Sequence, residues 1–142
     1  MASKVTADEV NAFYAEQFPG GGGRDRIVEV REDYARLRLA VDRSNIRPGG
    51  YISGPTQMAL ADSAAYVAIF TRIGIVPMAV TSSLTINFLR PCIGEAVIAE
   101  AILMKLGRSL AVIEVDIRAD GSDKTASHAV VNYALPSGSH AG

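Results

Sequence analysis

Cysteine, histidine and tryptophan are nearly absent from this 142-residue sequence, which has one cysteine, two histidines and no tryptophan. The single cysteine, Cys92, excludes an internal disulfide and is consistent with a reducing cytoplasm, the location that we expect. Together with His128 and His140 it supplies too few ligands for a zinc centre. We therefore predict no metal site.

Long runs of a single kind of residue are also missing. The formal net charge is −1 and lysine and arginine form no run, which argues against nucleic-acid binding as the main task. No apolar stretch reaches the length of a membrane span. Residues 1–4 lead into a polar segment rather than the apolar core of a signal peptide. We expect neither a nucleic acid nor a membrane as a partner.

Apolar residues, by contrast, are plentiful: 49% of the residues are hydrophobic and 20% are charged. The length predicts one main domain with one modest core. The apolar fraction exceeds what such a core requires, and this excess suggests contact between subunits.

The two ends of the chain are predicted to lie outside that domain. Thr6 and Glu9 have the spacing of a capping box, and apolar residues recur at helical spacing over residues 7–18. The glycines at 20–23 precede a predicted strand and lack a following Gly-Lys-Ser/Thr, so they indicate a connector rather than a phosphate-binding loop. Residues 1–23 are thus a short helix and a glycine-rich connector, and residues 137–142 a disordered tail.

Residues 24–136 are predicted to form the domain itself. Residues 26–31 and 34–41 are predicted to form two strands joined by a tight turn, and the second shows the alternation of apolar and polar residues typical of a strand. A loop at 42–52 and a helix ending near Gly74 follow. Four runs rich in Val, Ile and Thr predict further strands at 78–89, 95–106, 109–119 and 124–135. The short connections between these runs imply an antiparallel meander. One sheet wrapped around one central helix is an α+β fold.

The predicted central helix contains one unexplained acid, Asp62. The helix is apolar around nearly its whole circumference, so we expect it to be buried. A buried carboxylate is costly without a partner, and such residues concentrate at functional sites. The alternative is a structural acid satisfied by Ser63 or by backbone groups.

Three motifs in order resemble one known family. Residues 49–55 open the helix with Gly-Gly-Tyr-Ile-Ser-Gly-Pro, residues 61–64 read Ala-Asp-Ser-Ala, and residues 80–91 read Val-Thr-Ser-Ser-Leu-Thr-Ile-Asn-Phe-Leu-Arg-Pro. With Leu-Gly-Arg-Ser-Leu-Ala at 106–111, this order is similar to hotdog-fold acyl-CoA thioesterases, most of all the phenylacetate-degradation (PaaI-like) type. The resemblance covers about residues 24–135 and implies a hotdog fold.

The resemblance is incomplete at the start of the helix. The family usually has His-Gly-Gly there, and this sequence has Ser53, Gly54 and Pro55. An Asn commonly lies seven residues before the central glycine, where this chain has Arg47. The central glycine and the acid eight residues after it are retained, and Thr81 matches a hydroxyl position that helps to hold the attacking water.

Chemistry assigns roles to two of these residues. Asp62 is a candidate general base, or a nucleophile that passes through an anhydride. Gly54 lies where helix N–H groups are unpaired and the helix dipole is positive, so its N–H is a candidate oxyanion donor. Asp62, Gly54 and Thr81 are the candidate catalytic set. Candidate substrate contacts are Ser53, Arg47, Ser82, Ser83 and Arg90.

Each of these substrate contacts has a structural alternative. Ser53 also suits an N-cap, and Ser82 and Ser83 also suit a strand. Arg47 and Arg90 are candidates for the phosphates of coenzyme A, although loop arginines are commonly just solvated.

The spacing of the two main candidates predicts an oligomer. Gly54 and Asp62 are eight residues apart, which is about 12 Å of helical rise. Both cannot readily contact one carbonyl from a single chain, so we expect Gly54 of one subunit to act with Asp62 of another across a two-fold interface. The sequence leaves open a dimer or a tetramer.

The function expected from these arguments is hydrolysis of an acyl-CoA to a free acid and coenzyme A, with no cofactor beyond the coenzyme A of the substrate. Two alternatives stay open. An enoyl-thioester hydratase or dehydratase is disfavoured because no histidine precedes His128. A non-catalytic acyl-CoA-binding module would be consistent with Ser53 and Pro55 in place of the usual His and Gly. The acyl group cannot be identified from the sequence.

Overall fold

The computed structural model describes residues 2–18 and 25–137. Its elements follow in the order α1 (Ala7–Gln17), β1 (Asp25–Arg31), β2 (Tyr34–Ala40), a short 3-10 turn η1 (Arg43–Asn45), α2 (Gly54–Ile73), β3 (Val80–Phe88), β4 (Ala96–Leu106), β5 (Leu110–Ala119) and β6 (Ser127–Ala134). The predicted glycine-rich connector, and all of the predicted tail except Ser137, lie outside the described residues.

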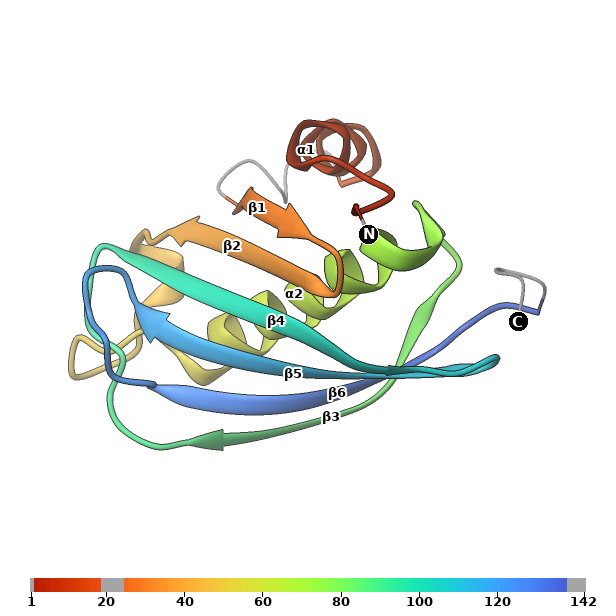
Figure 1. The fold of residues 1–142 in the computed structure, drawn as a ribbon. Coiled ribbons are helices and arrows are strands. Elements are labelled where there is room, and N and C mark those ends of the chain that lie inside the picture. Colours follow the sequence, from red (N-terminus) through yellow and green to blue (C-terminus); the bar gives the residue numbers. More distant parts are fainter. Residues whose placement is uncertain (1, 19–24, 138–142) are drawn as a thin grey trace.

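The strands of the described residues form one six-stranded antiparallel sheet in the order β1-β2-β4-β5-β6-β3. The sheet curves around α2, which lies along its inner face (Figure 1). The alternation predicted for β2 is confirmed, since Ala35, Leu37 and Leu39 are buried against the core while Arg38 is exposed. This one-sided burial is what positions α2 against the sheet.

The ends of α2 follow from local chemistry. Ser53 is the N-cap, and its hydroxyl accepts a hydrogen bond from the Thr56 N–H at 3.3 Å. Pro55 fits the first helical turn because it has no N–H to leave unpaired. Gly74 ends the helix with a φ of 81°, a conformation that glycine adopts without strain. The predicted helix limits are confirmed.

The predicted meander is wrong for β3. Strand β3 pairs with β6 at the edge of the sheet, so β5 and β6 lie between β3 and β4. Residues 89–95, which have the chemistry of a tight turn, instead cross the end of the sheet, and the Cys92 carbonyl accepts from the Ile52 N–H at 2.8 Å. The physical reason is α2, which lies between β2 and β3 in the chain and crosses the inner face of the sheet. Strand β3 therefore begins at the far edge.

Helix α1 packs beside β1, at the opposite edge of the sheet from β3 (Figure 1). Its capping box is present: Thr6 Oγ1 accepts from the Glu9 N–H and Glu9 Oε1 accepts from the Thr6 N–H. The Asn11 side chain makes two hydrogen bonds with the backbone of Ile27, to its carbonyl at 3.0 Å and from its N–H at 2.9 Å. This edge of the sheet is therefore partly satisfied by α1.

The outer edge of β3 has no pairing partner among the described residues. Along this strand Val80 is 56% exposed and Phe88 is 50% exposed, and the nearby Met78 and Leu89 are exposed too. Such an apolar, unpaired edge strand is a surface on which another chain can add.

The expected burial of α2 is correct for its C-terminal half only. Every residue from Ala64 to Thr71 is buried, whereas Met58 and Ala59 are exposed and Asp62 is partly buried. The C-terminal half is covered because Phe13 of α1 packs edge-on against Phe70, with ring centroids 5.8 Å apart. The arrangement of one long helix held in a curved antiparallel sheet is the hotdog fold, as the resemblance implied.

Within the described ranges, none of the helices is both long enough and apolar enough to cross a membrane.

Candidate active site

Five of the eight predicted site residues line two separate hollows, one at the N-terminus of α2 and one beside its middle. The Asp62 pocket, of about 320 Å³, is lined by Tyr14, Phe18, Asp62, Ser63, Tyr66, Pro77, Ala79, Val80, Thr81 and Tyr133. The Gly54 pocket, of about 580 Å³, is lined by Arg47, Tyr51, Ile52, Gly54, Pro55, Gln57, Phe88, Leu89, Arg90, Pro91 and Cys92. The two sets have no residue in common.

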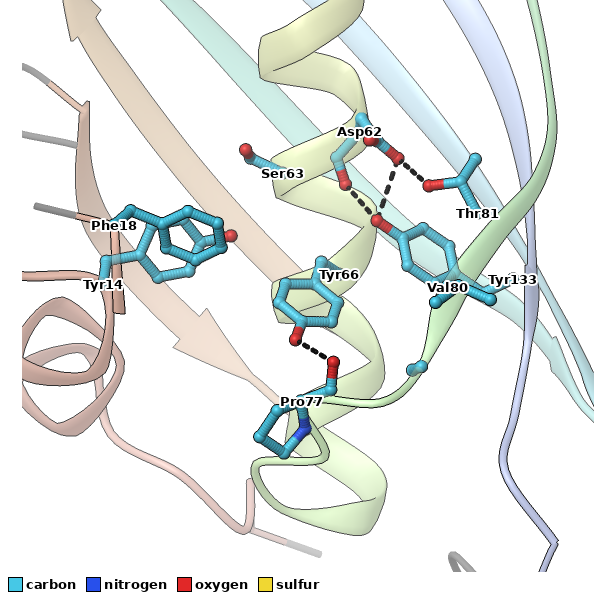
Figure 2. A pocket seen from close by; sticks show the side chains of 10 residues that line it. Tyr14, Phe18, Asp62, Ser63, Tyr66, Pro77, Val80, Thr81 and Tyr133 are labelled. Carbon is cyan, nitrogen blue, oxygen red and sulfur yellow. Dashed lines mark hydrogen bonds between the residues drawn. The ribbon is translucent and has the colours of Figure 1, made fainter. Parts of the chain in front are cut away.

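In the Asp62 pocket, one oxygen of Asp62 is held by two hydroxyl groups. Thr81 donates to Asp62 Oδ1 at 2.6 Å, and the phenol of Tyr133 lies 2.9 Å from the same atom (Figure 2). The phenol also lies 3.0 Å from the Asp62 backbone carbonyl. Oδ2 accepts no hydrogen bond from the described part of the chain. The carboxylate is thus fixed in orientation, with one oxygen left for chemistry.

Tyr133 is a member of the site that the sequence did not reveal. Burial is the main cause that raises the pKa of its phenol, and the Asp62 carboxylate raises it further. The phenol therefore stays protonated at neutral pH and can donate to Asp62. Its only sequence signal was a hydroxyl-bearing aromatic residue on the apolar face of the last strand, and nothing linked it to a helix residue 71 positions earlier.

A β-bulge directs Thr81 into the pocket. On β3 the inward positions pair with inward positions of β6: Leu84 with Val131 and Ile86 with Ala129. Simple alternation would place Ser82 inward, but the register shifts between Thr81 and Ser83, and Thr81 then pairs with Tyr133. The extra residue brings the two hydroxyls side by side at Asp62, which is a common use of bulges near active sites.

The Gly54 pocket begins at the N-terminus of α2. The Gly54 N–H donates to no group of the described residues, because it precedes the first helical hydrogen bond. A side chain at this position would place its Cβ 3.2 Å from Phe88 Cζ, a tight contact that glycine avoids. The predicted oxyanion donor is therefore unpaired and lines a hollow.

A buried amide anchors this end of the helix. Gln57 Nε2 donates to the Ile52 carbonyl at 3.2 Å, and Ser127 donates to Gln57 Oε1 at 2.6 Å. The Gln57 side chain thus ties the first turn of α2 to the preceding loop and to β6. Sequence analysis missed it, since a lone glutamine in a helix carries no signal of burial.

Arg47 and Arg90 both line the Gly54 pocket, one from the loop before α2 and the other from the segment after β3. Both residues are exposed, and the Arg90 guanidinium donates to the Thr125 carbonyl. The Gly54 pocket thus carries positive charge, whereas the ionisable groups that line the Asp62 pocket, among the residues that the structure describes, are Asp62 and its tyrosines. An anionic group is therefore favoured at the Gly54 pocket and disfavoured at the Asp62 pocket.

Three predicted substrate contacts lie outside both pockets. The Ser53 hydroxyl is engaged as the N-cap and lies 2.8 Å from Thr56 Oγ1. Ser82 is the exposed residue of the bulge. Ser83 accepts a hydrogen bond from Asn132 Nδ2 at 2.8 Å on the outer face of the sheet. Within one chain the structure brings Asp62 to Thr81, and Gly54 to Arg47 and Arg90.

Residues 49–126 match the model of the thioesterase superfamily. No curated protein matches the sequence. A crystal structure from a Silicibacter species, assigned to the thioesterases, is 31% identical, with a TM-score of 0.87 over 96% of this chain and 95% of that one.

Two more distant structures share the fold. Thioesterase superfamily member 2 of zebrafish is 19% identical, with a TM-score of 0.82 over 94% of this chain and 100% of that one. The PaaI protein of Escherichia coli, from the phenylacetic acid degradation operon, is 22% identical, with a TM-score of 0.78 over 92% and 93%. At this level of identity the likeness is evidence of the fold alone.

Proposed function

Because the chain belongs to the thioesterase superfamily and is a thioester hydrolase by class, we propose that it hydrolyses acyl-CoA thioesters at a site shared by two subunits. The products are a free acid and coenzyme A. The observation that carries the proposal is the division of the chemistry between two pockets: Asp62 with its hydroxyl partners in one, and the unpaired Gly54 N–H with two arginines in the other.

Asp62 is the group that activates water. Thr81 and Tyr133 hold Oδ1, so Oδ2 points its lone pairs at a water molecule and accepts a proton as the water oxygen bonds to the thioester carbonyl carbon. The carbon–sulfur bond then breaks, the carbonyl reforms, and the proton passes from Asp62 to the departing sulfur. The same oxygen is placed for direct attack, and trapping of an acyl-aspartate with hydroxylamine distinguishes that route from base catalysis.

Gly54 stabilises the charge that develops on the carbonyl oxygen. Its N–H is unpaired and lies at the positive end of α2, where an oxyanion is favoured. Arg47 and Arg90 of the same pocket are placed for the phosphates of coenzyme A. Ser53 and Pro55 preserve this end of the helix as N-cap and first-turn residue, so the absence of the usual His and Gly leaves the Gly54 donor in place.

Pairing of two copies through β3 joins the half-sites. The two ends of this nine-residue strand line different pockets: Val80 and Thr81 the Asp62 pocket, and Phe88 the Gly54 pocket. An antiparallel, two-fold pairing centred near Leu84 sets the Val80 end of one copy against the Phe88 end of the other. Each Asp62 pocket then adjoins the partner's Gly54 pocket, and the dimer holds two complete sites.

Replacement of the proposed base tests the mechanism. Asp62→Asn keeps the shape and the acceptor for Thr81 but cannot take a proton, so we expect kcat for a panel of acyl-CoAs to fall about 100- to 10,000-fold. Thiol release is measured with a chromogenic disulfide, and circular dichroism checks that the variant is folded. Full activity of folded Asp62→Asn would sink the mechanism, and a wild-type chain that releases no thiol from any acyl-CoA would sink the proposed substrate class.

A further inference from the structure

The Asp62 pocket has a wall that comes from outside the hotdog domain. Tyr14 and Phe18 belong to the N-terminal helix and its C-cap, yet both line this pocket. They stand across the hollow from Asp62, Thr81 and Tyr133, with Tyr66 between the two sides (Figure 2). One end of the pocket therefore holds the carboxylate and its hydroxyl partners, and the other end is closed by aromatic rings.

This wall is held firmly against the domain. Val10 of α1 is fully buried, and Asn11 is hydrogen-bonded to both backbone groups of Ile27. Phe13 packs on Phe70 of α2, and Tyr14 stacks at a tilt on Phe18 with ring centroids 5.0 Å apart. The position of the Phe18 ring thus follows from the docking of α1, although 46% of the residue is exposed.

The chemistry of the pocket selects what fills it. Among the described residues no lysine or arginine lines it, and the Asp62 carboxylate repels an anion, so phosphates and acidic tails are disfavoured. Its far side consists of rings and small apolar side chains. A volume of about 320 Å³ is at the lower end of what a drug-sized ligand occupies. The occupant is an apolar group of limited length.

We propose that the Asp62 pocket binds the acyl chain of the substrate and that Phe18 sets the longest chain that fits. This inference rests on the proposed thioester hydrolysis only for the position of the carbonyl beside Asp62. From there the chain runs past Tyr66 and ends against the Phe18 ring. Phe18 is accordingly a specificity-determining residue supplied by the N-terminal helix.

Two opposite substitutions test the length limit. Phe18→Ala removes the ring, and we expect kcat/KM for decanoyl- and dodecanoyl-CoA to rise about tenfold relative to butyryl-CoA, because each added methylene finds apolar contact. Phe18→Trp fills more of the pocket, and we expect the preference to move toward shorter chains. Phe18 is half-exposed at the end of its helix, so neither change removes a core residue.

Asn11→Ala is the matched control. Asn11 lies on the same helix and holds it to the Ile27 backbone, but it does not line the pocket. If loosening of α1 were the cause of any change, this variant would alter the chain-length profile as well. We expect its profile to match that of the wild type.

Binding separates this inference from the proposed function. Calorimetry with a series of non-hydrolysable acyl-CoA thioethers measures how the binding affinity depends on the length of the acyl chain. It needs no turnover, so it applies even if the wild type hydrolyses nothing. A shift toward longer chains in Phe18→Ala and toward shorter chains in Phe18→Trp supports the inference. An unchanged order of affinities in both variants, or the same shift in Asn11→Ala, overturns it.

Discussion

The two edges of the sheet are finished in opposite ways. At β1, helix α1 packs beside the strand, the Asn11 amide pairs with the Ile27 backbone, and the register shifts between Ile27 and Glu29. At β3, no described element pairs with the outer side of the strand, and the exposed residues include Val80 and Phe88. A covering helix and a β-bulge each block the addition of another strand at β1. Strand β3 has neither along its middle, among the described residues.

We call the β3 edge the open edge and the β1 edge the closed edge. The difference between them explains why the open edge is also where the site residues meet. Each end of β3 lines a different pocket, so the proposed pairing with a second copy would complete both. The closed edge does another task, because the helix that covers β1 also supplies Tyr14 and Phe18 to the Asp62 pocket. One edge is therefore expected to set assembly, and the other to set the size of the pocket.

A charge on the open edge is expected to have the largest effect. Thr85 is exposed near the middle of β3, so an aspartate there lies close to its own copy across the two-fold axis. We expect Thr85→Asp to be monomeric in sedimentation velocity and to lose about a thousandfold in kcat/KM, because each site loses its oxyanion donor.

Val28→Asp is the matched change at the closed edge. Val28 is exposed on β1, and α1 already covers that side of the sheet. We expect its oligomeric state and activity to equal those of the wild type. An active dimer of Thr85→Asp, or an equal effect of the two variants, would contradict the assignment of β3 as the interface.

Mixed dimers sharpen the role of the open edge. Asp62→Asn and Gly54→Val should each be nearly inactive alone, the second because its side chain meets Phe88 in the pocket. After denaturation and refolding of an equal mixture, half of the dimers carry both chains, and each has one intact site. Activity should recover to about a quarter of the wild type. A mixture no more active than its components would place both groups in the same chain.

Removal of either hydroxyl group that donates to Asp62 is expected to have a moderate effect on activity. Tyr133→Phe and Thr81→Val each delete one donor to Oδ1 and keep the volume of the side chain nearly unchanged. We expect kcat to fall about tenfold in each, with KM little changed, since a hydrogen bond to a charged group contributes about 1.5–3 kcal/mol at most. The control is Ser83→Ala, which removes a hydroxyl of β3 outside both pockets and should leave kcat unchanged.

The smallest expected effect is at the closed edge. Asn11→Ala leaves the N–H and the carbonyl of Ile27 without their partner, which should lower the free energy of unfolding by about 1–2 kcal/mol. Thermal unfolding at fixed protein concentration measures this as a fall of a few degrees in Tm. Glu16→Ala, on the exposed side of the same helix, should not change Tm. Equal melting of Asn11→Ala and wild type would show that α1 does not stabilise this edge.

Much of the fold was predictable because its signals are local. The capping box at Thr6, the N-cap at Ser53 and the end of α2 at Gly74 depend on residues within one turn of each other. The position of β3 was not predictable in this way. Turn chemistry at 91–94 is the same whether the chain makes a hairpin or crosses the sheet, and only packing around α2 decides between them.

Asp62 was recognisable as the one acid of an apolar helix, and its distance from Gly54 followed from the helical rise alone. These features were determined by the sequence because they lie within one continuous element. The tertiary structure alone decided that a bulge at Ser82 turns Thr81 inward, that Tyr133 reaches Asp62, and that Phe18 closes the same pocket. Such contacts join distant parts of the chain, and their geometry depends on strand register and helix docking that no local pattern specifies.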